Sequence, residues 1–435
     1  KRPVPINDTT PLWGKTPSEC TDEEYKEFYR KVFMDFKEPL FWIHLNMDYP
    51  FNLKGILYFP KINMEYDSIE GTIKLYNNQV FIADNIKEVI PEFLMLLKGV
   101  IDCPDLPLNV SRSALQNVGF VKKISDYITK KVADKLSGMC KTDKENYEKY
   151  WDDISPFIKY GCLRDNKFCD RINDYILFKD IYDKYTTLPE LLVKEEEKEE
   201  SKDSEIETPE IVGVDGQPIQ TDKDDDTTED EKDKRKVVDY VTDVQQQGQY
   251  ISMFKDQDMN AVILDHNIDT SFITQLEQRN EQYRFCRIDG DLTDSLVEED
   301  SSAEEETKTL SEVFKKHLNK EHLTVKAEKL KDETVASVLT VKEESRRMAD
   351  MMRMYSTNGL GGGMDADLFP QDETLILNAA HPLVKYMLEN TESESVSDLC
   401  HQLYDLARIQ NAPLNPEDMK EFVRRTNAIM LNQFQ

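Results

Sequence analysis

The sequence lacks the features of a membrane or secreted protein. No apolar run approaches the length of a transmembrane helix, and no apolar core of a signal peptide follows residues 1–5. The seven cysteines are scattered, odd in number and without C-x-x-C spacing, so we expect reduced thiols rather than disulfides. The closest pair, Cys162 and Cys169, has no histidine pair nearby, and we expect no metal site. These absences predict a soluble cytosolic protein.

Positive charge is also scarce. The 435 residues include 55 Lys and Arg against 85 Asp and Glu, which gives a net charge of -30 at pH 7. We therefore expect neither nucleic acid nor an anionic membrane as a partner, because both repel such a surface. Residues 194–236 are dominated by Glu, Asp, Lys, Ser and Thr, and we interpret them as an acidic disordered insertion. This insertion accounts for much of the excess negative charge without requiring an acidic binding site.

Nucleotide-binding motifs and an initiator methionine are missing as well. Residues 237–293 alternate strand and helix patterns as a small βαβαβ subdomain, but they contain no G-x-G-x-x-G and no phosphate-binding lysine motif. The glycine run at 359–363 is not a P-loop, because no Lys-Ser or Lys-Thr follows it. Since the chain begins with Lys1, we expect a fragment of a longer protein.

The patterns that are present predict several domains. The chain is 39% apolar, which is enough to build several cores. Residues 1–138 alternate strand and helix patterns and predict a large α/β segment, with a helix capping box at Thr21–Glu24 and a hairpin turn at Asn77-Asn78. Residues 139–193 predict a helical segment. After the subdomain at 237–293 come a polar hinge at 294–309 and an α+β domain at 310–435. The predicted fold class is therefore α/β and α+β, with several domains.

Two amphipathic helices close the chain, at Val396–Ile409 and from Asn415 onward. The apolar face of the last helix is wider than one neighbour needs, which suits a two-fold, four-helix dimerisation interface. The alternative is that both helices only cap their own domain. The residues that we expect at the interface are Leu399, Leu403, Leu406, Ile409, Met419, Phe422, Val423, Ile429 and Met430.

One stretch, Asp105–Gln116, delivers an arginine to the start of a long predicted helix. Pro107 favours extended backbone, and Ser113 with Gln116 has the spacing of a capping box. Arg112 therefore lies where a guanidinium and helix N–H groups can face one anion. The alternative is a structural ion pair within the domain. The apolar stripe of the helix comprises Phe120, Ile124, Ile128, Val132 and Leu136.

A methionine-rich segment surrounds the glycine run. Adaptable thioethers on such a segment suit unrelated apolar partners, because they repack at little cost. The alternative is that these side chains fill their own core. The candidate contact residues are Met348, Met351, Met352, Met354, Tyr355, Leu360 and Phe369.

Several strings match one known family, among them Lys98-Gly99-Val100-Ile101-Asp102 and above all Asp105-Leu106-Pro107-Leu108-Asn109-Val110-Ser111-Arg112. They resemble the ninety-kilodalton heat-shock chaperone family, close to its bacterial HtpG type. The resemblance covers nearly the whole chain except the acidic insertion. That family consists of an N-terminal ATP-binding domain, a middle domain and a C-terminal dimerisation domain, and this sequence is similar to the last two only.

The resemblance implies that Arg112 contacts the terminal phosphate of ATP, bound with Mg in the missing N-terminal domain. Gln116 matches a polar position that supports the same loop. An arginine delivered from outside the pocket stabilises charge on phosphoryl oxygens. We expect this chain alone to bind no cofactor and to hydrolyse no ATP, and we expect the missing ATPase domain to be one of its partners.

The resemblance also implies a bacterial cytoplasmic homodimer that binds partly folded client proteins in the cleft between its arms. The methionine-rich segment matches the family's amphipathic helix that faces this cleft. Near Ile268-Asp269, where bacterial members present a tryptophan to clients, this chain has Phe272, which we expect to take its place. Two other functions stay open: a self-contained nucleotide hydrolase that uses the βαβαβ subdomain, and an acidic scaffold or adaptor that acts through residues 194–236.

Overall fold

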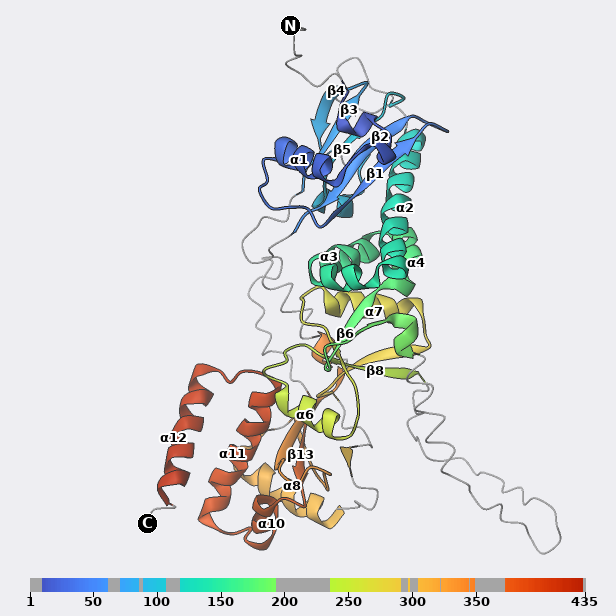
Figure 1. Ribbon diagram of the computed structural model, residues 1–435. Coiled ribbons are helices and arrows are strands. Elements are labelled where there is room, and N and C mark those ends of the chain that lie inside the picture. The colour runs from blue at the N-terminus through green and yellow to red at the C-terminus, as the bar shows by residue number, and fades with distance from the viewer. Residues whose placement is uncertain are drawn as a thin grey trace, which may run out of the picture. The chain divides into compact units, whose positions relative to one another are not determined.

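The structure, a computed structural model, describes residues 10–61, 71–85, 89–106, 118–192, 235–290, 296–297, 304–320, 322–343, 345–348 and 372–432. The chain forms two compact units, Lys1–Phe178 with Tyr185–Ile206, and Lys179–Lys184 with Glu207–Gln435 (Figure 1). The predicted subdomain at 237–293 and the predicted dimerisation domain at 310–435 therefore fall within the same unit.

The first unit contains a five-stranded mixed sheet of order β1-β2-β5-β3-β4. The hairpin predicted at Asn77-Asn78 is confirmed, because β3 and β4 pair in antiparallel and Asn78 has a φ of 51°. β5 was not predicted, and it lies between β2 and β3. At its Gly99 a Cβ atom would lie 2.6 Å from Leu57 Cδ2. The strands are β1 (Phe41–Met47), β2 (Leu53–Phe59), β3 (Ile73–Asn77), β4 (Val80–Asp84) and β5 (Lys98–Asp102).

The helix α1 (Asp22–Phe33) begins at the predicted capping box. Glu24 N donates to Thr21 Oγ1 at 3.3 Å, and Thr21 N donates to Glu24 Oε2 at 2.9 Å. Tyr25 and Tyr29 of this helix are buried in an aromatic cluster with Tyr58 of β2. Short 3₁₀ helices occur at η1 (Leu12–Gly14), η2 (Pro17–Glu19), η3 (Glu92–Leu96) and η4 (Asn173–Tyr175).

Three helices follow β5: α2 (Val118–Thr142), α3 (Lys144–Arg164) and α4 (Asn166–Ile172). The predicted stripe of α2 is confirmed. Phe120 is half-buried, and the other stripe residues are fully buried, namely Ile124, Ile128, Val132 and Leu136. The helical pattern predicted to Leu192 was wrong from 177 to 187, where the strands β6 (Leu177–Asp180) and β7 (Tyr185–Thr187) lie, and residues 188–192 are helical again. Ile176 to Phe178 form a short apolar run, which periodicity alone does not separate from a helix.

The predicted βαβαβ pattern is confirmed in the second unit. β8 (Lys236–Val241) pairs in parallel with both β9 (Val262–Ile263) and β10 (Tyr283–Arg287), and the full sheet has the order β10-β8-β9-β6-β7. The helices α6 (Gly248–Asp256) and α7 (Asp269–Arg279) connect the parallel strands.

A three-stranded sheet of order β11-β13-β12 lies in the same unit. Its strands are β11 (Leu323–Glu328), β12 (Ser337–Val341) and β13 (Glu373–Asn378). The helices α8 (Glu304–Leu318), α10 (Pro382–Glu389) and α11 (Glu394–Asn411) share one apolar core with this sheet, and α12 (Pro416–Asn432) packs beside α11 (Figure 1). The described elements are thus the mixture of α/β and α+β structure that the sequence predicts.

Candidate functional site

The predicted anion-binding residues Arg112 and Gln116 lie outside the described residues. The structure does describe where the chain leaves β5 toward them. Asn77 Nδ2 donates to the carbonyl oxygens of Cys103 at 3.1 Å, Pro104 at 3.2 Å and Leu106 at 3.4 Å. One side chain of the neighbouring hairpin therefore fixes the path of the backbone at the entry to the predicted site.

A turn after α1, residues 34–37, exposes two large apolar side chains, and we call it the apolar turn. Phe36 is 92% exposed and Met34 is 79% exposed. Between them, Asp35 accepts hydrogen bonds from Tyr29 Oη at 2.7 Å and from Lys98 Nζ at 2.5 Å. Burial would raise the pKa of Asp35, but the bonds from Lys98 and Tyr29 outweigh burial and lower it. The turn is thus held by an ionised carboxylate while its apolar side chains face solvent.

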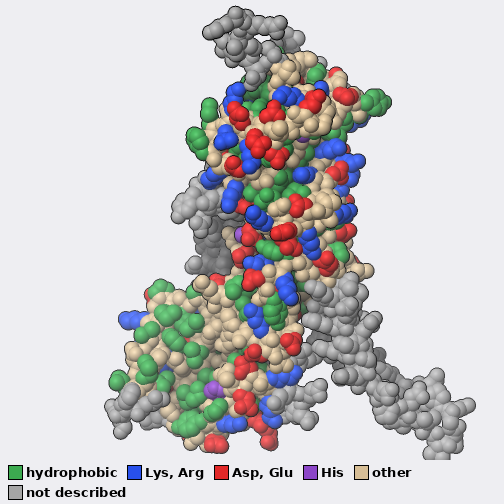
Figure 2. Space-filling model, viewed as in Figure 1, with side chains coloured by type: hydrophobic (Ala, Val, Ile, Leu, Met, Phe, Trp, Pro, Cys, Tyr) green, Lys and Arg blue, Asp and Glu red, His purple; other side chains and the backbone are tan. Residues whose placement is uncertain are grey.

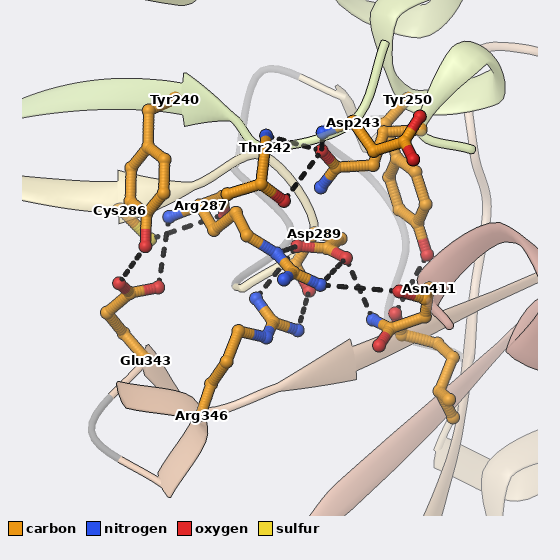
Figure 3. Close-up of polar contacts among 12 residues, drawn as sticks. Tyr240, Thr242, Asp243, Tyr250, Cys286, Arg287, Asp289, Glu343, Arg346 and Asn411 are labelled. Atoms are coloured by element: carbon orange, nitrogen blue, oxygen red, sulfur yellow. Dashed lines mark hydrogen bonds and ion pairs between the residues drawn. The ribbon is translucent and has the colours of Figure 1, made fainter. Parts of the chain in front are cut away.

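A buried carboxylate, Asp289, joins three segments of the second unit (Figure 3). It is 0% exposed, and it accepts hydrogen bonds from Arg287 Nε at 2.6 Å, Arg346 Nη1 at 2.8 Å and Asn411 Nδ2 at 2.9 Å. Burial would raise the pKa of Asp289, but the bond from Arg287 and the charges of both arginines hold it below its usual range. Ionised Asp289 therefore ties the end of β10 to residues 345–348 and to the last residue of α11.

A second carboxylate, Glu343, extends this arrangement, which we call the Asp289 network (Figure 3). Glu343 accepts from Tyr240 Oη at 2.6 Å, from the backbone N–H of Arg287 at 3.0 Å and from Arg347 Nε at 2.7 Å. Arg347 also pairs with Glu277 of α7 at 2.5 Å. Two consecutive arginines thus anchor the start of the predicted methionine-rich segment to β8, β10 and α7.

Of the predicted client-contact residues, Met348 is described and is 52% exposed, directly after the two anchored arginines. Phe272 is 0% exposed within α7, so its ring offers no surface to a client in this structure. Ile273 and Leu276 of the same helix are buried as well, so Phe272 belongs to the buried face of α7. The other predicted contacts, Met351, Met352, Met354, Tyr355, Leu360 and Phe369, lie outside the described residues.

The predicted interface residues of α11 and α12 divide into two groups. Leu403 is fully buried in the core that α11 shares with the three-stranded sheet, and Leu399 packs partly against that core, so Leu403 serves its own chain. Figure 2 shows apolar side chains gathered over α11 and α12. The exposed ones are Leu406, Met419, Val423, Met430 and Leu431, and Ile409, Phe422 and Ile429 are half-buried.

Other binding chemistry is sparse in the part of the chain that the structure describes. No group of His, Cys, Asp and Glu there has the arrangement of a metal site, and no described helix is long and apolar enough to cross a membrane. None of the seven cysteines, all of which are described, forms a disulfide bond. An open hollow of about 330 Å³ in the second unit is lined by Met253, Asp256, Gln257, Leu296, Lys331, Asp332 and Glu333. Three carboxylates against one lysine disfavour a nucleotide phosphate there.

Sequence reasoning missed both the apolar turn and the Asp289 network. Asp289 and its partners Arg346 and Asn411 are separated by 57 and 122 residues, so no local spacing links them. The one available signal was the charged pair Arg346-Arg347 at the start of a methionine-rich segment.

Comparison with known proteins gives one consistent result. A sequence model described as Hsp90 protein matches residues 1–201 and 239–435. The chaperone protein HtpG of Porphyromonas gingivalis is 38% identical over 429 residues, which cover 95% of this chain and 56% of the relative. The HtpG of Bacteroides thetaiotaomicron is 37% identical over 438 residues, covering 98% and 57%. The chain thus spans little more than half the length of these relatives.

Proposed function

The chain belongs to the Hsp90 protein family, in its bacterial HtpG type, and we propose that it is the client-binding and dimerising part of a molecular chaperone. The observation that carries client binding is the apolar turn. A phenylalanine that is almost fully exposed, on a turn held by an ionised aspartate, can receive apolar segments of unfolded chains. Burying one such ring contributes about 1.5–3 kcal/mol, so clients are held weakly and broadly.

In the second unit, Met348 is a separate exposed apolar side chain, and the predicted contacts beyond it complete the proposal. Two copies of the chain associate through the exposed faces of α11 and α12, where Met419, Val423 and Met430 would leave water. Seven cysteines that form no disulfide bond, together with the bacterial relatives, support the bacterial cytoplasm as the compartment.

Arg112 and Gln116 complete an ATPase site whose ATP and Mg are held by another part of the full-length protein. The support is the sequence string around Arg112 and the family membership. Within this chain, Asn77 holds the backbone of residues 103–106, which leads toward that loop. The chain alone hydrolyses no ATP, and a phosphate-release assay on it measures this: turnover that Arg112→Ala abolishes would favour the self-contained hydrolase.

Client binding is tested with a reduced and alkylated, permanently unfolded protein as the probe. Phe36→Ser should weaken its binding about tenfold, since about 1.4 kcal/mol of apolar contact corresponds to a factor of ten. Val80→Ser is the matched control, because Val80 is an exposed apolar residue of the same unit. Equal affinities of the two variants and the unmodified chain would refute the role of the apolar turn. Deletion of residues 194–236 should leave binding and dimerisation intact, and loss of both would favour the acidic adaptor.

A further inference from the structure

The contact between α11 and α12 includes three polar pairs, one for each successive turn of α11. We call these pairs the polar ladder. They are Gln402 Nε2 with Thr426 Oγ1 at 3.0 Å, Asp405 Oδ2 with Arg425 Nη2 at 2.8 Å, and Arg408 Nη1 with Asp418 Oδ2 at 2.8 Å. The order of the partners reverses along the two helices, as antiparallel packing requires.

The middle pair of the ladder is buried. Arg425 is 6% exposed and is the one buried residue among those described on α12, and its partner Asp405 is 7% exposed. A helix that packs only for stability usually buries an apolar stripe. Here the buried residue of α12 belongs to an ion pair, Phe422 and Ile429 beside it are only half-buried, and Met419 and Val423 are exposed.

Helix geometry relates the ladder to the exposed apolar residues. At about 100° per residue, Met419, Val423 and Met430 lie within about 40° of one another around the axis of α12. Their stripe is centred roughly 130° from the face of Arg425 and Asp418, and roughly 40° from Thr426. A slip of one residue along the ladder would turn α12 by about 100° and carry the stripe away from its present direction.

The order of charges favours the observed register. Along α11 the sequence of charge is Asp405 then Arg408, and along α12 it is Asp418 then Arg425. A slide of α12 by two turns would bring Asp405 to Asp418, or Arg408 to Arg425. Like charges at such short distances repel, and more strongly where water is excluded.

We propose that the polar ladder sets the rotation of α12 on α11 and so decides which apolar side chains a second copy of this chain meets. Asp405 and Arg425 are positioning residues of the dimer, with no direct contact to the partner required. This inference rests on the proposed dimer, and it adds the element that makes the dimer surface unique. A buried ion pair adds little stability compared with apolar residues of similar size, but it can specify one arrangement.

The test replaces the buried pair by apolar residues, in the variant Asp405→Leu with Arg425→Met. Its helix content and thermal midpoint should stay close to those of the unmodified chain, because such replacements are often neutral or stabilising. Its dimer dissociation constant, from sedimentation equilibrium, should rise about tenfold or more. The matched control is Glu421→Gln with Arg424→Gln, which removes an exposed ion pair of 2.8 Å within α12 and should leave the constant unchanged.

The outcomes separate the ladder from the dimer itself. An unmodified chain that stays monomeric at all concentrations overturns both proposals. If the unmodified chain is a dimer that Val423→Asp dissociates, the dimer proposal stands. An unchanged dimer dissociation constant in the apolar double variant then overturns the ladder alone. If the double variant unfolds, the single variant Gln402→Leu breaks the outer pair without touching the ions, and it should weaken the dimer by a smaller factor. An unchanged constant there would also refute the ladder.

Discussion

Removal of the Asp289 carboxylate should destabilise the second unit and leave the first unaffected. Asp289→Ala deletes the acceptor of four hydrogen bonds, two from Arg287, one from Arg346 and one from Asn411. Both guanidinium groups are then left largely buried without their carboxylate partner. Breaking a buried ion pair by removing one partner costs about 3–5 kcal/mol. With a urea m-value of about 3 kcal/mol/M, a loss of about 4 kcal/mol lowers the unfolding midpoint by about 1.3 M.

The chain carries its own probes for this experiment. Trp13, Trp42 and Trp151 are the only tryptophans, and all three lie in the first unit. Tryptophan fluorescence therefore follows the first unit, whereas far-ultraviolet circular dichroism follows both. In Asp289→Ala, the urea midpoint of the second unit, followed by dichroism, should fall. The midpoint followed by tryptophan fluorescence should not change. Glu421→Gln, at an exposed ion pair, is the control and should move neither.

Acid gives a second measurement of the same network. Because the folded-state pKa of Asp289 lies below its usual value, its contribution to stability is present above the unfolded-state pKa, about 3.9. That contribution is lost as pH falls through the lower folded-state pKa. Asp289→Asn should therefore flatten the acid limb of the stability curve for the second unit. A midpoint shift equivalent to less than about 1 kcal/mol, with an unchanged acid limb, would show that the arginines find other partners and would refute the reasoning.

Two further predictions concern neighbouring elements. Arg347→Ala should speed amide hydrogen exchange at residues 345–348 about tenfold or more, because a charged hydrogen bond is worth about 1.5–3 kcal/mol; protection equal to that of the unmodified chain would contradict the anchoring role. Leu403→Ala should destabilise the second unit by about 2–5 kcal/mol, measured by dichroism, because this side chain is fully buried in its own core; a selective loss of dimer with unchanged protomer stability would instead support an interface role.

The fold was predictable wherever a local signal decides the structure. The capping box at Thr21, the hairpin at Asn77-Asn78 and the βαβαβ alternation each depend on residues that are close in sequence. β5 was missed because its pairing with β2 and β3 is not local, and because Gly99 weakens a strand pattern. The tight approach of Leu57 explains the glycine, but that approach exists only after the sheet has formed.

The candidate site was less predictable, because exposure and burial there run against residue type. Phe36 follows a helix in a Met-Asp-Phe-Lys string that alternates apolar and charged residues, a pattern that predicts a half-buried strand. Met34 instead takes a left-handed φ of 51°, and Lys98 of β5 captures Asp35, which leaves Phe36 in solvent. Conversely, Arg346 and Arg425 are buried because a distant aspartate compensates each of them. A single sequence records the residues of such pairs but not their pairing, and the pairing is what sets the direction in which the neighbouring apolar side chains point.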